Sequence, residues 1–150
     1  MRSHDAADCC ADAVTGLAEA VLSEIADLLD QFAASGAQSS IDLSGLPMTD
    51  ADREKLAQRL GRGEVQATLD VAGQTDVWET QYAGVWWVRH FGGNGQVISE
   101  EIAITHVPAI LLTHREDARA AAERLRKACE VLEATTAADQ SSAERDSIHA

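Results

Sequence analysis

Histidine and carboxylate side chains in the middle of the chain could do metal or acid/base chemistry. His90 and His106 lie in a region of strand-forming residues, and Glu79 follows Trp78 in the same region. A catalytic zinc site needs three converging ligands and an open fourth position, and acid/base catalysis needs a carboxylate with a raised pKa. The sequence has no H-x-x-x-H or C-x-x-C pair. Structural roles are therefore favoured, and a small metal-dependent or acid/base enzyme using His90, His106 and Glu79 is the alternative.

Three cysteines are the next candidates for chemistry. Cys9 and Cys10 are adjacent and cannot easily ligate one metal tetrahedrally, while Cys129 lies in a helical stretch. Three thiols in a chain with no run of 18 apolar residues and no signal-like segment predict a cytoplasmic protein in a reducing compartment, with no membrane insertion. We expect no catalytic residue, no bound metal and no cofactor.

The charge of the chain excludes one class of partner and leaves two interpretations of its acidic surplus. Acidic residues outnumber Lys plus Arg by 25 to 12, giving a net charge of −13, and no Lys or Arg lies between Arg2 and Arg53. This balance excludes nucleic acid as a partner class, because no excess of cations is available for phosphates. The surplus either keeps the protein soluble or attracts a basic partner. The candidate residues for such a partner lie on the first predicted helix, and they are Glu19, Glu24, Asp27 and Asp30.

Helical periodicity defines elements on both sides of the central region. Apolar residues spaced by three and four predict a helix over residues 8–32, and Thr49 followed by Asp52 predicts the start of a short helix that Gly61 ends. A third helix runs from Thr113 to about Ala134. Its predicted inner stripe is Ala118, Ala121, Leu125, Ala128 or Cys129, and Leu132. The domain is expected to span residues 9–135, between a flexible N-terminus (1–8) and a disordered tail (136–150).

Alternation of apolar and polar residues predicts strands between the second and third helices. Four segments show it, separated by short glycine-containing turns, and they are residues 64–71, 75–82, 85–91 and 96–105. Short connections imply antiparallel neighbours. The fold class is therefore α+β, a four-stranded antiparallel meander with two helices before it and one long helix after it. Pro108 ends the sheet, and residues 41–48 form an extended segment.

Two features of the strands affect possible binding surfaces. Trp86 and Trp87 are adjacent, so their side chains point to opposite faces of the sheet. There are two alternatives. In the first, one indole faces solvent as part of a binding surface, and in the second, both faces of the sheet are covered. In the last strand, the parity of Ile102 and Ile104 places Glu100 on the buried face. A β-bulge at Glu100–Glu101 is predicted to relieve this. The Trp-bearing face or the first helix could also support a homodimer.

Several ordered motifs in this region carry a resemblance to a known family. They are Leu60-Gly61-Arg62-Gly63-Glu64-Val65, Val77-Trp78-Glu79-Thr80, Gly84-Val85-Trp86-Trp87-Val88, Glu101-Ile102-Ala103-Ile104 with Val107-Pro108, Leu46-Pro47-Met48, and Glu116-Asp117. Together they resemble the C-terminal conserved region of the HupH/HyaF/HoxQ family, over about residues 41–130. The acidic first helix lies before this region.

The resemblance implies a non-enzymatic, chaperone-like accessory protein of nickel–iron hydrogenase maturation. Its implied partner is the precursor of the hydrogenase small subunit, whose twin-arginine signal region is one candidate for the contact. Among the motif residues, Gly61, Gly63, Gly84, Trp86 and Pro108 have structural roles available. The expected partner-binding residues are Glu64, Glu79, Trp87 and Arg89 on a sheet face, assisted by Glu19, Glu24, Asp27 and Asp30 on the first helix.

Overall fold

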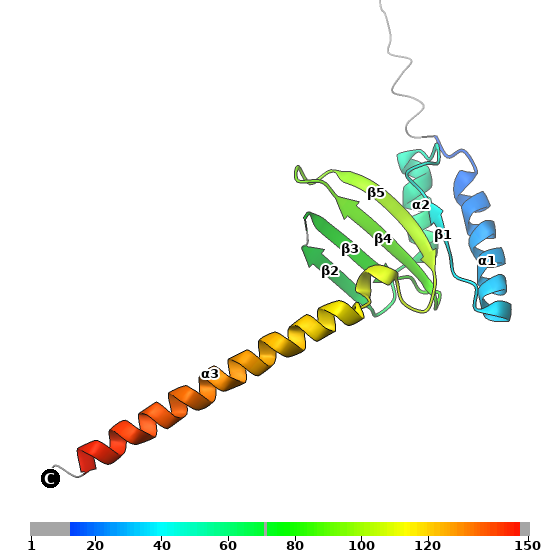
Figure 1. Ribbon diagram of the computed structural model, residues 1–150. Helices are drawn as coiled ribbons and strands as arrows, with labels where there is room; N and C mark the ends of the chain where they lie inside the picture. Colours follow the sequence, from blue (N-terminus) through cyan, green and yellow to red (C-terminus); the bar gives the residue numbers. More distant parts are fainter. Residues whose placement is uncertain (1–12, 71, 148–150) are drawn as a thin grey trace, which may run out of the picture. The chain divides into compact units, whose positions relative to one another are not determined.

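A five-stranded antiparallel sheet is the centre of the structure, a computed structural model that describes residues 13–70 and 72–147. The spatial order is β1-β5-β4-β3-β2 (Figure 1). Strands β2 to β5 follow one another in sequence as the predicted meander. The strands are β1 (Ser39–Asp42), β2 (Gln66–Asp70), β3 (Gln74–Glu79), β4 (Val85–Phe91) and β5 (Val97–Ile104).

The expected number of strands was wrong, because β1 adds a fifth strand at the edge of the meander. It pairs antiparallel with β5, from Ser39 opposite Ile104 to Asp42 opposite Glu101. The segment has only one strongly apolar residue, Ile41, and its pairing partner lies far along the chain. A strand this short has too little alternation to be recognised without its partner.

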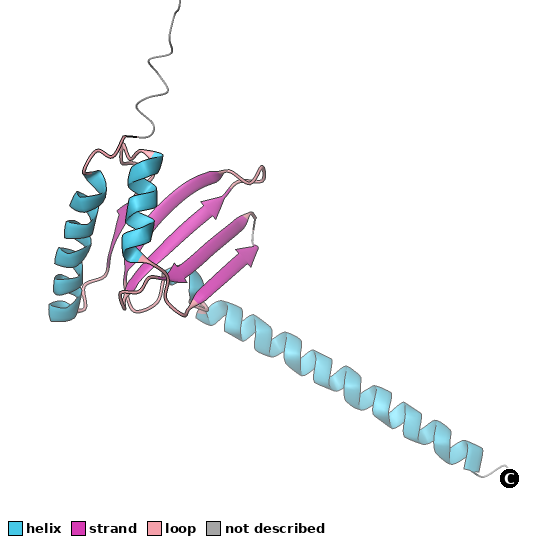
Figure 2. Ribbon diagram, turned by 180° about the vertical axis from the view of Figure 1, so that it is seen from behind, coloured by secondary structure: helices cyan, strands magenta, loops and turns pink. Residues whose placement is uncertain are grey.

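Two helices, α1 (Leu17–Ser35) and α2 (Asp50–Leu60), lie side by side against one face of the sheet (Figures 1 and 2). Gly36 ends α1 in a left-handed conformation with φ 72°, as expected for a helix C-cap. The helix begins after Gly16, later than predicted, because Gly16 also adopts positive φ. Residues 13–16 of the predicted helix are not helical, and residues 8–12, with Cys9 and Cys10, lie outside the described residues, as does the N-terminus 1–8.

The predicted start and end of α2 are confirmed. The Thr49 hydroxyl accepts a hydrogen bond from the Asp52 N–H at 3.1 Å, and the Asp52 carboxylate accepts one from the Thr49 N–H at 3.2 Å, which together make a capping box. Gly61 follows the helix at φ 60° and donates its N–H to Ala57. The buried side of α2, Leu56 and Leu60, faces the sheet core. That core consists of Ala18, Val21, Ile25, Leu43, Leu56, Leu60, Trp78, Val85, Trp87, Ile102 and Ile104.

The predicted position of the β-bulge was wrong. Phe91 pairs with Val97 and His90 pairs with Ser99, so the unpaired residue of β5 is Ile98. Glu100 consequently keeps the parity of Ile102 and is buried. A bulge at Glu100–Glu101 would have turned this carboxylate out of the core, whereas in the fold it stays buried and pairs with Arg53 and Arg89.

The chain divides into two units between Ile110 and Leu111, and the second unit is almost entirely one helix, α3 (Arg115–Ser147). A 3-10 turn, η1 (Ala109–Leu111), precedes it. Taken by itself, α3 has no buried residue, and Leu125 and Leu132 of the predicted inner stripe are each 67% exposed. The helix also continues to Ser147, through residues for which a disordered tail was predicted, because this segment contains no Gly or Pro.

The sheet face opposite α1 and α2 also carries buried side chains. Val77, Trp86 and Val88 lie there, and the Trp86 indole Nε1 donates to the Thr105 carbonyl at 3.2 Å. Pro108 is buried just after the sheet, in line with its predicted role at the end of the last strand. None of the described helices is both long and apolar enough to cross a membrane.

Candidate protein-binding surface

The glycine-rich segment after α2 is fastened to the end of β3 by backbone hydrogen bonds. Gly63 donates to the Glu79 carbonyl at 2.7 Å, and Glu79 donates to the Val65 carbonyl at 2.9 Å. A Cβ at position 63 would lie 2.7 Å from the Thr80 carbonyl oxygen, so only glycine allows this approach. Gly63 is therefore structural, as the sequence suggested.

Arginine and tryptophan side chains stack beside this segment. Trp78 of β3 and Trp87 of β4 are cross-strand partners whose rings lie 5.5 Å apart and are nearly parallel. The Arg62 guanidinium lies 4.2 Å from the centre of a Trp78 ring, and the Arg89 guanidinium lies within 6 Å of both indoles. The stack holds both guanidinium groups over apolar rings, and Arg89 Nε also binds Glu100.

Glu100 is the centre of a buried hydrogen-bond network that the sequence analysis missed as a functional group. Its carboxylate accepts from Arg53 Nη1 at 2.5 Å, from Arg89 Nε at 2.6 Å and from the Trp87 indole Nε1 at 3.0 Å. Its backbone N–H donates to the Ser44 hydroxyl at 2.8 Å. A buried carboxylate requires such compensation. Its parity with Ile102 was a visible signal, but its arginine partners come from distant segments.

The two glutamates expected to bind a partner have different surroundings. Glu79 is half-buried, and its Oε1 accepts a hydrogen bond from the Gly84 N–H at 3.3 Å. This contact closes the turn between β3 and β4, where Gly84 has φ 83°. Glu64 is exposed, next to the Gly63 anchor. Glu79 therefore has a structural task, and Glu64 is accessible.

Trp87 cannot touch a partner as predicted, because it is only 1% exposed and lies in the core beneath the helices. Trp86, on the opposite face, is 5% exposed. Both indoles are thus covered, which was the second of the two alternatives that the sequence allowed. Arg89 is partly accessible, but its Nε donates a hydrogen bond to the buried Glu100 and is not available to a partner. A sheet face centred on an exposed tryptophan is consequently absent from the described residues.

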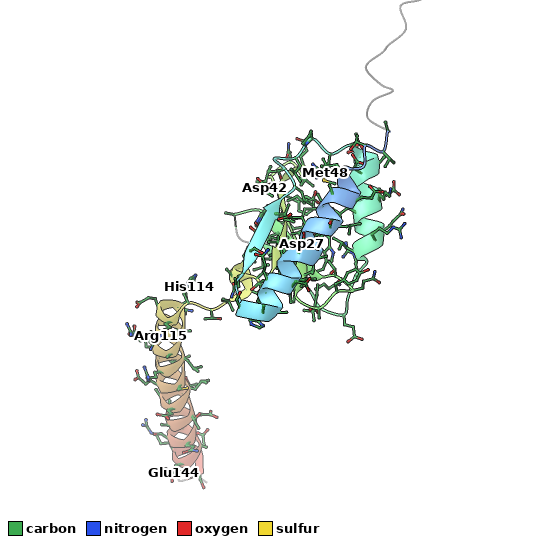
Figure 3. The ribbon with its side chains drawn as sticks, turned by 90° about the vertical axis from the view of Figure 1, so that its right-hand side faces the viewer. Asp27, Asp42, Met48, His114, Arg115 and Glu144 are labelled. Atoms are coloured by element: carbon green, nitrogen blue, oxygen red, sulfur yellow. The ribbon has the colours of Figure 1, made fainter. Side chains whose placement is uncertain are left out.

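The acidic residues of α1 lie on its outer side. Glu24, Asp27 and Asp30 are exposed, and Figure 3 shows Asp27 on α1 where this helix lies in front of the sheet. Glu19 differs because it pairs with Lys55 of α2, and this hydrogen bond lowers the pKa of the Glu19 carboxyl. Within the described part of the chain, no Lys or Arg pairs with the other three acids.

An apolar groove lies between α1, α2 and the turn after β3. We call it the α1–α2 groove, and it has a volume of about 290 Å³. Its lining residues are Leu22, Ile25, Ala26, Leu29, Arg59, Leu60 and Tyr82. Asp30 lies one helical turn after Ala26, so a carboxylate borders the groove on the α1 side. The structure therefore places negative charge beside exposed apolar surface, including the ring of Tyr82.

The two histidines of the alternative enzyme hypothesis have separate surroundings. His90 Nδ1 is hydrogen-bonded to the Thr75 hydroxyl at 2.8 Å, and the His106 ring packs edge-on against Phe32 at 4.7 Å. Within residues 13–70 and 72–147, no three His, Cys, Asp or Glu side chains gather as metal ligands. Cys129 is an exposed free thiol of α3.

Asp52 ties the chain before α1 to the start of α2. Besides the capping box, its carboxylate accepts from the Thr15 hydroxyl at 2.7 Å and from the Thr15 N–H at 2.9 Å. These bonds, with the Thr49 N–H, outweigh burial and lower the pKa of Asp52 from 3.8 to about 2. The Thr49–Asp52 spacing was readable from sequence, whereas the Thr15 contact was not.

Comparison with known proteins identifies relatives of most of the chain. A family model described as "HupH hydrogenase expression protein, C-terminal conserved region" matches residues 16–132. The match includes α1, which the sequence resemblance had left outside. A solved structure, hydrogenase expression protein HupH from Thiobacillus denitrificans ATCC 25259, superimposes with a TM-score of 0.72 at 41% identity. The alignment covers 77% of this chain and 98% of that one.

Curated relatives carry similar names. Hydrogenase expression/formation protein HoxQ of Azotobacter vinelandii is 33% identical over 115 residues, which are 75% of this chain and 41% of that protein. Hydrogenase expression/formation protein HupH of Rhodobacter capsulatus is 36% identical over 112 residues, which are 73% of this chain and 40% of that protein. The chain thus spans about two-fifths of the length of these relatives.

Proposed function

The chain belongs to the family of HupH hydrogenase expression proteins, through their C-terminal conserved region, and we propose that it is a non-enzymatic accessory protein of nickel–iron hydrogenase maturation. In this proposal it binds the precursor of the hydrogenase small subunit. Contact before export of the subunit would take place in the cytoplasm. The names of the relatives support the process.

The proposed contact surface is the outer side of α1 together with the α1–α2 groove. The single observation that carries this choice is the exposed, unpaired position of Glu24, Asp27 and Asp30 on α1, where Asp30 borders a groove lined mainly by leucine, isoleucine and alanine. A segment with cations next to an apolar run complements such a surface in both charge and hydrophobicity. A twin-arginine signal region has this chemistry, since arginines precede its apolar stretch.

The electrostatic part of the proposal is tested by neutralising the three unpaired acids. In the variant Glu24→Gln, Asp27→Asn, Asp30→Asn, affinity for the small-subunit precursor should fall about tenfold at low salt, since each exposed charge contributes a few tenths of a kcal/mol to attraction. The matched control is Glu123→Gln, Glu130→Gln, Glu133→Gln on α3, which changes the net charge equally. Titration calorimetry at low and high ionic strength measures both.

The groove is tested separately with Tyr82→Ser, which removes an exposed aromatic side chain of the groove. We expect weaker binding at every salt concentration, because this contribution is hydrophobic. Val107→Ser, another exposed apolar site outside the groove, is the control. Unchanged affinity of both test variants would rule out this surface, and failure of the unmodified chain to bind the precursor at micromolar concentration would rule out the proposed partner.

A further inference from the structure

A second cleft lies on a different part of the first unit, where the loop after β1 and the start of α2 meet the β4–β5 hairpin. Its volume is about 510 Å³, within the range of small-ligand sites. We call it the arginine cleft, and its lining residues are Ser44, Asp50, Arg53, Arg89, Val97, Ile98 and Glu100. It shares no lining residue with the α1–α2 groove.

The two arginines of the cleft are held in place before any ligand arrives. Glu100 binds Nη1 of Arg53 and Nε of Arg89 with one carboxylate oxygen each, and the Arg89 guanidinium also lies over Trp78 and Trp87. Both side chains are 31% exposed, so part of each reaches the cleft. Fixed guanidinium groups lose little conformational entropy when they bind a further anion.

Hydrogen-bonding capacity remains on the donors of the cleft. In the described part of the chain, the Arg89 terminal nitrogens have no hydrogen-bond acceptor, and Arg53 Nη2 reaches only the Leu43 carbonyl, at 3.4 Å. The Ser44 hydroxyl oxygen accepts the Glu100 N–H, which leaves its own O–H free to donate. Two guanidinium groups share one buried carboxylate, so Glu100 compensates only one of their two positive charges.

Apolar surface borders these donors. Val97 is 48% and Ile98 is 66% exposed, because the bulge in β5 turns Ile98 outward. In addition, β1 pairs with β5 only at residues 101–104, so that the same edge of β5 at residues 97–99 has no strand beside it among the described residues. A ligand that lies here meets cations, apolar side chains and a strand edge within a few residues.

From this arrangement we propose that the arginine cleft binds the C-terminal carboxylate of a peptide whose last side chain is apolar. In the last residue of a peptide, the carboxylate and the side chain are attached to the same Cα and therefore lie close together. The cations and the apolar surface of the cleft also lie close together, so one terminal residue can contact both. The peptide backbone can pair with the edge of β5, as in strand addition. This site is separate from the precursor contact proposed above, and either can hold without the other.

Asp50 provides a test that a purely structural role of the arginines would not affect. It is exposed, it lines the cleft, and it is not among the ion-paired carboxylates of the described residues. Its charge opposes a bound carboxylate. Asp50→Asn should therefore tighten binding about two- to fivefold at low salt, and the gain should shrink as salt is added.

The experiment measures fluorescence anisotropy of the full chain with a labelled alanine peptide that ends in leucine with a free carboxylate. The same peptide with a terminal amide should bind about tenfold more weakly, because a charge-assisted bidentate contact is lost. Arg89→Lys should reduce the preference for the free carboxylate about fivefold, since lysine lacks the planar fork. Ile98→Ser should weaken binding of the leucine peptide without affecting a peptide that ends in glycine. Circular dichroism checks that each variant is folded.

Several outcomes would overturn the assignment. Equal binding of the free acid and the amide, or no binding of either up to millimolar concentration, would exclude a carboxylate site. Equal binding of an amidated peptide with an internal glutamate would give the site to acidic side chains, and displacement by equimolar inorganic phosphate would make it a general anion site. Unchanged affinity in both Asp50→Asn and Ile98→Ser, which alter exposed residues and should fold, would also contradict the proposal.

Discussion

Individual carboxylates of this protein have different roles according to the donors around them. Glu100 and Asp52 are buried and fully hydrogen-bonded, Glu79 closes a turn, and Glu24 and Asp27 are exposed. A glutamate in a sequence gives no direct sign of which role it has. Glu79, expected from its motif to bind a partner, instead holds the turn at Gly84.

Acid stability should depend on Asp52. Its pKa is about 2 in the folded protein and 3.8 in the unfolded chain, so the unfolded state binds more protons between these values. The stabilisation from this carboxylate is complete above the unfolded value and is lost as the pH falls through about 2. Urea midpoints measured from about pH 5 down to about pH 2 should therefore fall less steeply for Asp52→Asn than for the unmodified chain.

The matched control for this prediction is Asp50→Asn, an exposed acid in the same helical turn. It should keep the steep acid dependence of the unmodified protein. Identical slopes for Asp52→Asn and the unmodified chain would show that the Thr15 and Thr49 hydrogen bonds do not favour the charged form.

At the level of elements, the segment 61–65 joins α2 to the sheet and sets where β2 begins. Its motif was readable from sequence as a helix end followed by a strand, and Gly61 confirms the helix end. What the motif did not show is the close approach of Gly63 to the carbonyls of Glu79 and Thr80. That requirement exists only because β3 returns to this point.

Replacing Gly63 by alanine should therefore destabilise the fold by about 1–3 kcal/mol, because the new methyl group overlaps a backbone oxygen that cannot move freely. Gly93→Ala is the control, since a Cβ at position 93 meets no atom within 4 Å. Urea unfolding followed by tryptophan fluorescence compares the two variants. Equal stability of Gly63→Ala and Gly93→Ala would contradict the packing described for this segment.

For the molecule as a whole, the buried side chains and the long helix belong to different units. All core residues lie between Ala18 and Ile104, and α3 has no buried residue. A helix stabilised mainly by its own backbone opens more readily than a packed sheet. The two units should consequently differ in local stability even though both are regular in structure.

Hydrogen exchange measured by mass spectrometry should resolve this difference. Amides of β3, β4 and β5 should exchange slowest, at rates set by global unfolding, and amides of α3 should exchange at least about a hundredfold faster. Addition of urea at concentrations well below the unfolding midpoint should accelerate the sheet amides more than those of α3. Protection of α3 equal to that of β4 would show instead that the helix is packed against another surface in solution.

The sequence by itself determined what depends on neighbours along the chain. The α+β class, the meander from β2 to β5, the Thr49 start of α2 and the membership in a hydrogenase-related family follow from alternation, caps and ordered motifs. These signals are local, because hydrogen bonds of helices and hairpins join residues close in sequence.

Only the tertiary structure decided which side chains meet across long separations. It paired β1 with β5, moved the bulge to Ile98 and buried Trp87. It also placed Arg53 and Arg89 on one buried carboxylate and set Asp30 of α1 beside an apolar groove. The physical reason is that such contacts depend on how the elements pack, and a periodic pattern gives the face on which a residue lies without giving the partner that it meets there.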